Sequence, residues 1–375
     1  MQNQILTQLL GIAVKGDKIN EKSLSGITLE LFSCVMNLAE SHGVESVIVN
    51  ALEKEGFDDS WQQVINAYQK KQLYSVVKTT RLEFEESTLF GLLNGAGFSF
   101  MAVKGSVIRS LYPKSQMRSS CDIDVFVAKN SQKGVCQLLE SNGYKRVKDY
   151  KDEITYISSS KQSVELHFDF AEGEKAWASL FEKVWENATR FKEYEFGKKL
   201  CPEDVVIYHL VHIAKHLLGG GSGVKTILDT YILESKLEYD KEVVESRLKE
   251  VGLDKLYKEV IALKDYWFNG KDASETTRKL GDFIISGGAY GSDERKNQIK
   301  KGKGKIRYAL SRAFPSFGEL KTTYPVLVKC AVLYPFCIVA RWISFIFGKK
   351  PKKETNAARF EGKEIARLLK DLGVK

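Results

Sequence analysis

The pattern of apolar positions predicts helices over the first part of the chain. Apolar residues recur every three to four positions across residues 1–75, which is the spacing of amphipathic helices. One such run ends at His42-Gly43, where a histidine favoured by the helix dipole precedes a helix-stopping glycine. A further helix is predicted from Leu73 to Leu93, and it leads into the first strand of a core.

Short runs typical of strands follow. Residues 98–104 form an apolar strand that ends at Lys104, and Gly105-Ser106 then opens a short helix. The next strand carries Asp122 and Asp124, which project to one face because side chains alternate along a strand. Three further elements are predicted, a helix over Gln132–Ser141 and strands over Thr155–Ser158 and Val164–Phe170.

The rest of the chain returns to helical spacing. A helix begins at Pro202 with acids in its first turn, and the glycine-rich stretch at residues 219–223 ends it. More helices follow up to a glycine-rich joint at residues 287–291. A long apolar segment covers Val326–Phe347, and a short amphipathic helix is predicted over Ala357–Leu372.

The paired acids Asp122 and Asp124 indicate a cation site. Neighbouring carboxylates repel each other and raise each other's pKa, so such a pair persists where water, cations or a metal ion screens it. Carboxylate oxygens suit Mg²⁺, which keeps several waters and shares its other positions with substrate phosphates. The sequence therefore predicts a magnesium site on this strand.

Gly105 and Ser106 indicate a phosphate site beside the acids. A glycine lets the backbone approach a phosphate closely, and the start of the following helix offers free N–H donors. We expect the cations Lys104, Arg109 and Arg118 to contact a nucleoside triphosphate there.

Three histidines share one stripe of the helix that begins at Pro202. His209, His212 and His216 fall at steps of three and four. Zinc chelation is disfavoured, since no Glu follows the first histidine as in a metalloprotease and no cysteine is near. A buried helix whose histidines bond to backbone or carboxylates explains at least one of them. We prefer an interpretation in which His212, Lys215 and His216 line a nucleotide site.

These residues resemble a known group of enzymes. Gly105-Ser106 followed by Asp122-Ile123-Asp124 is similar to the signature of the polymerase-beta-like nucleotidyltransferase superfamily. A narrower resemblance, from about Thr80 onward, is to a little-characterised bacterial family of large nucleotidyltransferases with helical additions. It is carried by Lys104-Gly105, Tyr112-Pro113, Arg118, Asp122-Ile123-Asp124, Glu165-Leu166-His167, Pro202-Glu203-Asp204, His212, His216, Asp229 and Gly288-Ala289-Tyr290-Gly291. Two departures from the superfamily are a longer loop after Ser106 and a lysine before Gly105.

The resemblance implies an α+β fold, in which a small mixed β-sheet nucleotidyltransferase core is flanked by large N- and C-terminal helical regions. It implies catalysis by Asp122, Asp124 and Glu165 with two Mg²⁺ ions, which Mn²⁺ could replace, and it implies that Asp229 lies near the nucleotide, bonded to a histidine. On pattern alone, Glu165 shares a polar strand face with Asp169, the second choice for the third carboxylate. An edge strand with a solvated side is the other interpretation of that face.

Four regions follow from the pattern and the resemblance together. They are an N-terminal helical region at 1–78, a nucleotidyltransferase core at 79–200, a helical region at 201–290 that completes the site, and a basic, apolar C-terminal region at 291–375.

The net charge of +9 is concentrated in the C-terminal region. Residues 291–375 hold 20 Lys and Arg against 7 Asp and Glu, so the basicity says little about a nucleic-acid groove in the core. Lys329, Pro335 and Arg341 argue against a simple membrane span over Val326–Phe347. We expect this segment to pack in the core or, as the second choice, to rest peripherally on anionic lipid at the inner membrane face.

The cysteines and the N-terminus favour a cytoplasmic protein. The six cysteines show no Cys-x-x-Cys spacing, which disfavours both a zinc site and a disulfide scaffold. The first residues have no positive leader and no small-residue cleavage site, so secretion is not supported.

The leading functional hypothesis is a metal-dependent transferase. It moves a nucleoside monophosphate from a triphosphate such as ATP to an acceptor hydroxyl and releases pyrophosphate. The alternatives are a catalytically inactive nucleotide-binding or regulatory module, against which the presence of all three carboxylates counts, and a membrane-surface assembly factor for glycan or lipid pathways. A sugar, another small molecule, a protein side chain or an RNA end would each serve as acceptor, and the sequence does not choose among them.

Overall fold

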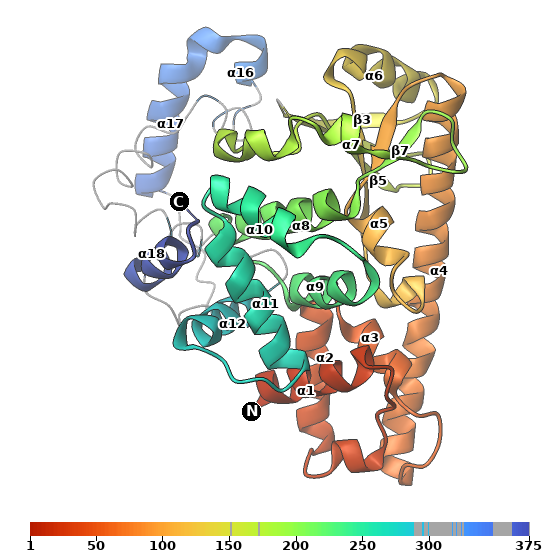
Figure 1. The fold of residues 1–375 in the computed structure, drawn as a ribbon. Coiled ribbons are helices and arrows are strands. Elements are labelled where there is room, and N and C mark those ends of the chain that lie inside the picture. The colour runs from red at the N-terminus through yellow and green to blue at the C-terminus, as the bar shows by residue number, and fades with distance from the viewer. Residues whose placement is uncertain are drawn as a thin grey trace.

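The computed structural model describes residues 1–150, 152–171, 173–288, 326–347 and 362–374, together with the single residues 295, 299, 317, 320 and 324. The fold is α+β, as the resemblance implied: a mixed seven-stranded sheet has helical regions before and after it in the chain (Figure 1).

The N-terminal helices form one end of the molecule. They are α1 (Gln2–Val14), η1 (Glu21–Leu24), α2 (Leu29–Ser41) and α3 (Glu45–Ala51). Helix α2 ends at His42, as predicted, but this histidine is buried. Its Nε2–H donates to the carbonyl of Ile285 at 3.1 Å, and its Nδ1 accepts from the amide of Val224 at 3.3 Å. Burial lowers the pKa of His42 to about 4, so the neutral ring joins α2 to two distant helices.

Helix α4 (Asp59–Gly95) runs from these helices to the sheet (Figure 1). Its 37 residues span about 55 Å at 1.5 Å per residue. The prediction that it starts at Leu73 was wrong, since Asp58 caps it by accepting from the amides of Ser60 and Trp61. The early turns pack on the N-terminal helices and the late turns on the sheet, so no single apolar stripe marks the whole helix.

The sheet has the strand order β3-β4-β5-β2-β1-β7-β6. Its central strand β2 runs antiparallel to β1 and parallel to β5. One face packs on the C-terminal half of α4 and on α6, which spans Gln132–Ser141 as predicted. The strands are β1 (Phe100–Ala102), β2 (Asp122–Val127), β3 (Lys145–Asp149), β4 (Glu153–Ile157), β5 (Ser163–His167), β6 (Thr189–Arg190) and β7 (Gly197–Lys199).

Several strands differ from the prediction in their bounds or were not predicted, and β5 and β3 have a clear physical reason. Strand β5 ends at His167 rather than Phe170, because the carboxylate of Asp169 accepts from the amides of Ala171 and Gly173 and so turns the chain. Strand β3 was not predicted, since all five of its residues are exposed and its polar sequence does not alternate.

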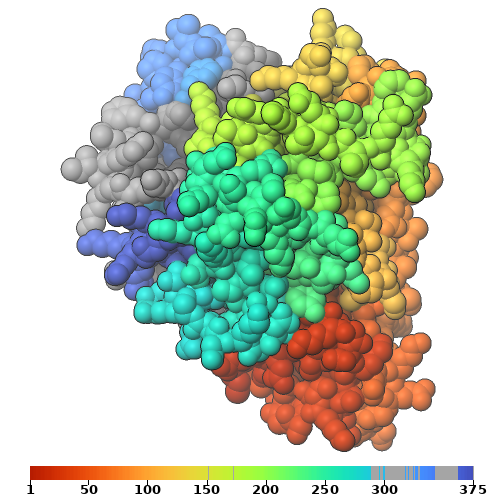
Figure 2. Space-filling model, viewed as in Figure 1, coloured from red at the N-terminus to blue at the C-terminus, as the bar shows by residue number. Residues whose placement is uncertain are grey.

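Helices cover the other face of the sheet. Figure 2 shows the segment that contains α9 to α12 over the middle of the molecule, with the N-terminal helices below it. The long helices after the sheet are α8 (Pro202–Leu218), α9 (Val224–Lys236), α10 (Lys241–Glu250), α11 (Asp254–Phe268) and α12 (Glu275–Gly287). The short connecting helices are α5 (Gly105–Arg109), η2 (Ser115–Met117), η3 (Lys129–Ser131), η4 (Lys175–Phe181) and α7 (Val184–Asn187).

The C-terminal elements are α16 (Val326–Lys329), η5 (Ala331–Leu333), α17 (Tyr334–Phe347) and α18 (Gly362–Asp371). The expected core packing of residues 326–347 holds only in part. Cys337 and Ile338 are buried, but Val332 is 78% exposed and Phe336 69% exposed. Within the described parts of the chain, no helix has the length and apolar character needed to cross a bilayer. Most of the basic run from residue 295 to 307 and the joint at 289–291 lie outside the described residues.

Candidate active site

A cavity of about 330 Å³ lies between one end of the central strands and the helices α8 and α9. Strands β2, β4 and β5 contribute carboxylates to its wall, and the helices contribute cations and histidines. Its polar lining residues are Lys104, Arg118, Ser119, Ser120, Asp122, Asp124, Glu153, Glu165, Tyr208, His209, His212, Lys215, His216, Lys225, Thr226 and Asp229.

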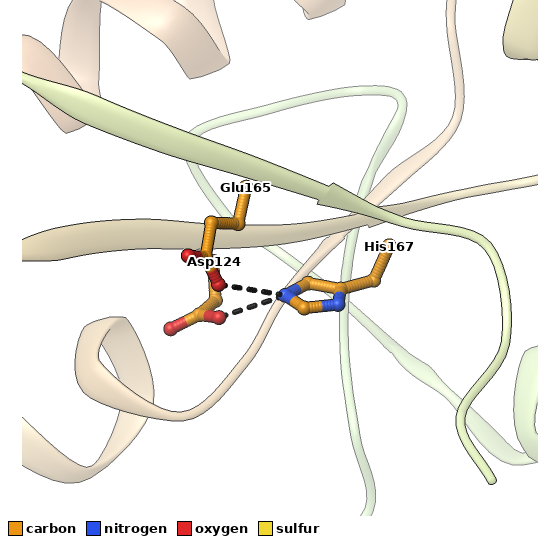
Figure 3. Close-up of side chains that lie close together, drawn as sticks. All are labelled: Asp124, Glu165 and His167. Carbon is orange, nitrogen blue, oxygen red and sulfur yellow. Dashed lines mark hydrogen bonds and ion pairs between the residues drawn. The ribbon is translucent and has the colours of Figure 1, made fainter. Parts of the chain in front are cut away.

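Strand pairing brings the acids together. Because β2 and β5 are parallel neighbours, Asp124 stands directly opposite Glu165, and Asp122 lies on the same face two residues earlier. Figure 3 shows both carboxylates turned toward His167, whose Nε2 lies 2.8 Å from Oδ1 of Asp124 and 3.7 Å from Oε2 of Glu165. The ligand atoms of Asp124, Glu165 and His167 all lie within 4.8 Å of one another.

The electrostatics of this cluster suit a divalent cation. Burial, followed by the charges of Asp124, Glu153 and Asp122, raises the pKa of Glu165 to about 8. Burial and the charge of Asp124 also raise the pKa of Asp122. Such crowding of buried carboxylates is relieved by a cation, and carboxylate oxygens are ligands that Mg²⁺ and Mn²⁺ accept. The residues present therefore fit a divalent metal ion.

Lys104 is a cation that touches this cluster. Its Nζ lies 2.9 Å from Oδ1 of Asp124. Although burial acts to raise the pKa of Asp124, the positive charge of Lys104 and the hydrogen bond from His167 lower that pKa far below its usual range.

Ser106 and Arg109 are not among the residues that line the cavity. Both bind Glu86 of α4: the hydroxyl of Ser106 donates to Oε2 at 2.8 Å, and Nη2 of Arg109 lies 2.5 Å from the same oxygen. Gly105 packs closely on the following loop, since a Cβ there would lie 2.9 Å from Oγ of Ser120. These residues hold α5 between α4 and the loop.

Arg118 and Asp229 line the cavity but bind each other. Nε and Nη2 of Arg118 each donate to one carboxylate oxygen of Asp229 at 2.9 Å. The hydroxyl of Tyr112 donates to the same carboxylate at 2.8 Å. Asp229 therefore lines the same cavity as the acids of the strands, and the groups that bind its carboxylate here are an arginine and a tyrosine.

All three histidines of the stripe border the cavity, but their contacts differ. His209 is buried and its Nε2 lies 3.0 Å from the carbonyl of Thr226, and burial lowers its pKa to about 4. His212 and His216 line the cavity, with their Nε2 atoms 2.9 Å apart in a hydrogen bond. Lys215 lines it as well. Among the described residues, no Cys, Asp or Glu joins the pair in a metal-binding group.

Two charged residues of the cavity were missed. Lys225, in the first turn of α9, lines the cavity and its Nζ donates to the carbonyl of Ser119 at 3.2 Å. Burial, followed by the charge of Arg118, lowers its pKa. The four-residue step to Asp229 puts both on one helix face, a signal that could have found it. Glu153 enters from β4, and nothing in its local sequence marks it.

A comparison with sequence-family models bears on the identity of this chain. Residues 30–269 match the model of a family described as uncharacterised nucleotidyltransferases. A search of curated proteins returns no match. Solved structures similar to this chain include the antibiotic-resistance factor ANT(2'')-Ia, with 10% identity, a TM-score of 0.35 and coverage of 52% of this chain and 100% of that one. Another is an antigenic nucleotidyltransferase-like protein from Paracoccidioides brasiliensis, with 17% identity, a TM-score of 0.33 and coverage of 52% and 95%. Because the family match spans more than half of the sequence, this chain belongs to that family of uncharacterised nucleotidyltransferases.

Proposed function

We propose that the protein transfers a nucleoside monophosphate from a nucleoside triphosphate to an acceptor hydroxyl and releases pyrophosphate, in the cytoplasm. The observation that supports this most is the convergence of Asp122, Asp124 and Glu165 at one wall of a single cavity. The opposite wall comes from α8 and α9, which supports a role for residues 201–290 in completing the site.

Asp122, Asp124 and Glu165 would hold two Mg²⁺ ions, or Mn²⁺, with His167 beside them. When bound, the ions supply positive charge that stabilises the reacting phosphate and lowers the pKa of the attacking hydroxyl. In the metal-free protein the pKa of Glu165 is about 8, and the positive charge of bound ions would lower it. We assign the hydroxyl's proton to the carboxylate of Glu165 in that ionised form.

The cations and histidines that line the cavity would bind the triphosphate. Lys104, Lys215, His212 and His216 have this role in the proposal, and Lys225 joins them. Arg118 and Asp229 act indirectly by fixing the loop and α9 against each other. Ser106 and Arg109 position α5 through Glu86, which sets where Lys104 and Gly105 stand.

Replacing Asp122 by asparagine is expected to lower Mg²⁺-dependent pyrophosphate release about a hundredfold, because a metal ligand is lost. Release is measured with each nucleoside triphosphate and with sugars, small hydroxylated molecules, proteins and RNA ends as acceptors, with and without EDTA. The fold should be retained, since burial and Asp124 already disfavour the charge of Asp122. Unchanged Mg²⁺-dependent transfer in Asp122→Asn would refute the proposal. Nucleotide binding by the wild type without any release would favour the inactive module.

The exposed apolar face of η5 and α17 supports a second role, peripheral contact with anionic membranes. Val332, Phe336 and Val339 lie one turn apart and are at least half exposed, in a region rich in Lys and Arg. The double variant Val332→Asp, Phe336→Asp is expected to bind anionic vesicles about tenfold less in a flotation assay. Leu73→Asp, Tyr74→Asp on α4 is the matched control, as both residues are exposed. Equal flotation of both variants and the wild type would remove this role.

A further inference from the structure

Lys104 has an unusual backbone conformation. Its φ is +47° and its ψ is −113°, in a region that side-chain-bearing residues rarely occupy. Among the described residues, only Lys161 is another non-glycine residue with positive φ. The turn is held from both sides, since the amide of Ser106 donates to the carbonyl of Val103 and the amide of Ile108 to that of Lys104. Rare backbone conformations that the surrounding structure maintains are concentrated at functional sites.

The side chain of Lys104 reaches the centre of the carboxylate cluster. Its Nζ lies 2.9 Å from Oδ1 of Asp124, the same oxygen that Nε2 of His167 approaches at 2.8 Å. The side chains of Lys104 and Asp124 are 14% and 5% exposed, so water screens this contact only weakly. Although burial raises the pKa of Asp122 and of Glu165, the charge of Lys104 opposes that rise at both, so one ammonium group acts on all three carboxylates.

Two N–H donors on one carboxylate oxygen use both of its lone-pair directions. A metal ion that binds this oxygen must therefore displace a donor. His167 is held at the end of β5, whereas the lysine ammonium is at the end of a flexible four-carbon chain and can leave.

We propose that Lys104 is a built-in counter-ion, which neutralises Asp124 while no metal is bound and is exchanged for the metal ion when nucleotide arrives. This inference rests on the proposed function. The displaced ammonium needs a new anion, and the phosphates of a nucleotide supply it. Metal and nucleotide then load cooperatively, each raising the affinity of the other by the same factor.

Mn²⁺ binding without nucleotide, measured by electron paramagnetic resonance, tests the exchange. Lys104→Met is expected to lower the Kd for Mn²⁺ about tenfold, because the competing ammonium is gone. Lys104→Gly tolerates a positive φ and should lower the Kd by the same factor. If the glycine variant alone binds Mn²⁺ more tightly, release of backbone strain is responsible and the counter-ion role is refuted. Lys225→Met is the matched control, a cavity lysine whose Nζ contacts a carbonyl, and its Kd should change much less.

A non-hydrolysable triphosphate analogue tests the coupling. In the wild type it is expected to tighten Mn²⁺ binding about tenfold more than in Lys104→Met. A Kd for Mn²⁺ that is unchanged or weaker in Lys104→Met overturns the exchange. Asp122→Asn separates this failure from failure of the proposed function. If Asp122→Asn weakens Mn²⁺ binding while Lys104→Met has no effect, only the exchange is wrong. If neither the wild type nor Lys104→Met binds Mn²⁺, the metal site itself is wrong.

Discussion

Replacing Glu165 by glutamine is expected to stabilise the metal-free protein at pH 8 while lowering nucleotide transfer about a thousandfold. The folded-state pKa of Glu165 is about 8, well above its unfolded value. Between those two values the folded protein keeps a proton that the unfolded chain has released, so the free energy of unfolding falls as the pH rises toward 8. The Glu165 side chain is 25% exposed, so water screens part of the effect. The free energy of unfolding is therefore expected to fall by about 2 kcal/mol, which is less than the pKa shift alone would give.

Urea denaturation in EDTA at pH 5 and pH 8 measures this effect. The wild type should lose stability between the two pH values relative to Glu165→Gln, whose amide does not titrate. Mg²⁺ should restore stability to the wild type and much less to the variant, because a ligand stabilises only the folded state that binds it. Glu165→Asp, which keeps a titrating carboxyl group, is the matched control. A pH dependence that is identical in Glu165→Gln and the wild type would contradict the assignment of the raised pKa.

Replacing Arg118 by methionine is expected to cost about 3–5 kcal/mol of folding free energy. Asp229 is 1% exposed, and Arg118 donates two hydrogen bonds to its carboxylate. The substitution therefore leaves a buried negative charge without its cation. Urea denaturation at pH 7 measures the loss. Because Arg118 is also buried and sits between the loop and α9, nucleotide binding should weaken with the fold.

Two variants serve as controls for this pair. Tyr112→Phe removes one hydrogen bond to Asp229 and is expected to cost only about 1 kcal/mol. The double variant Arg118→Met, Asp229→Asn removes both charges and should recover part of the loss. A loss below about 1 kcal/mol in Arg118→Met would mean that the pair does not hold the loop to α9.

Local sequence predicted the faces of the site strands. Alternation alone put Asp122 and Asp124 on one face, and it put Glu165 and His167 on one face. It could not show that β2 and β5 are parallel neighbours, because that pairing joins residues about forty positions apart. The family resemblance implied the third carboxylate, and the register explains why that residue lies beside Asp124.

The partners of the predicted cations could not be read from the sequence. Arg109 binds Glu86, and Arg118 binds Asp229, which lies 111 residues away. A cation beside a glycine turn suggests a phosphate ligand, but a long-range carboxylate satisfies it equally well. Lys104 differs from these two arginines, because the carboxylate that it contacts, Asp124, belongs to the candidate metal-binding cluster.

Helix α4 connects the N-terminal helices to the turn that bears Lys104, so the positions of the two are coupled. Residue 78, the end of the N-terminal helical region in the sequence analysis, falls inside this unbroken helix. Its early turns lie against α2 and α3, and Glu86, further along, carries the hydrogen bonds to Ser106 and Arg109. A displacement of α2 and α3 would therefore be transmitted through the continuous helix α4 to the turn that bears Lys104.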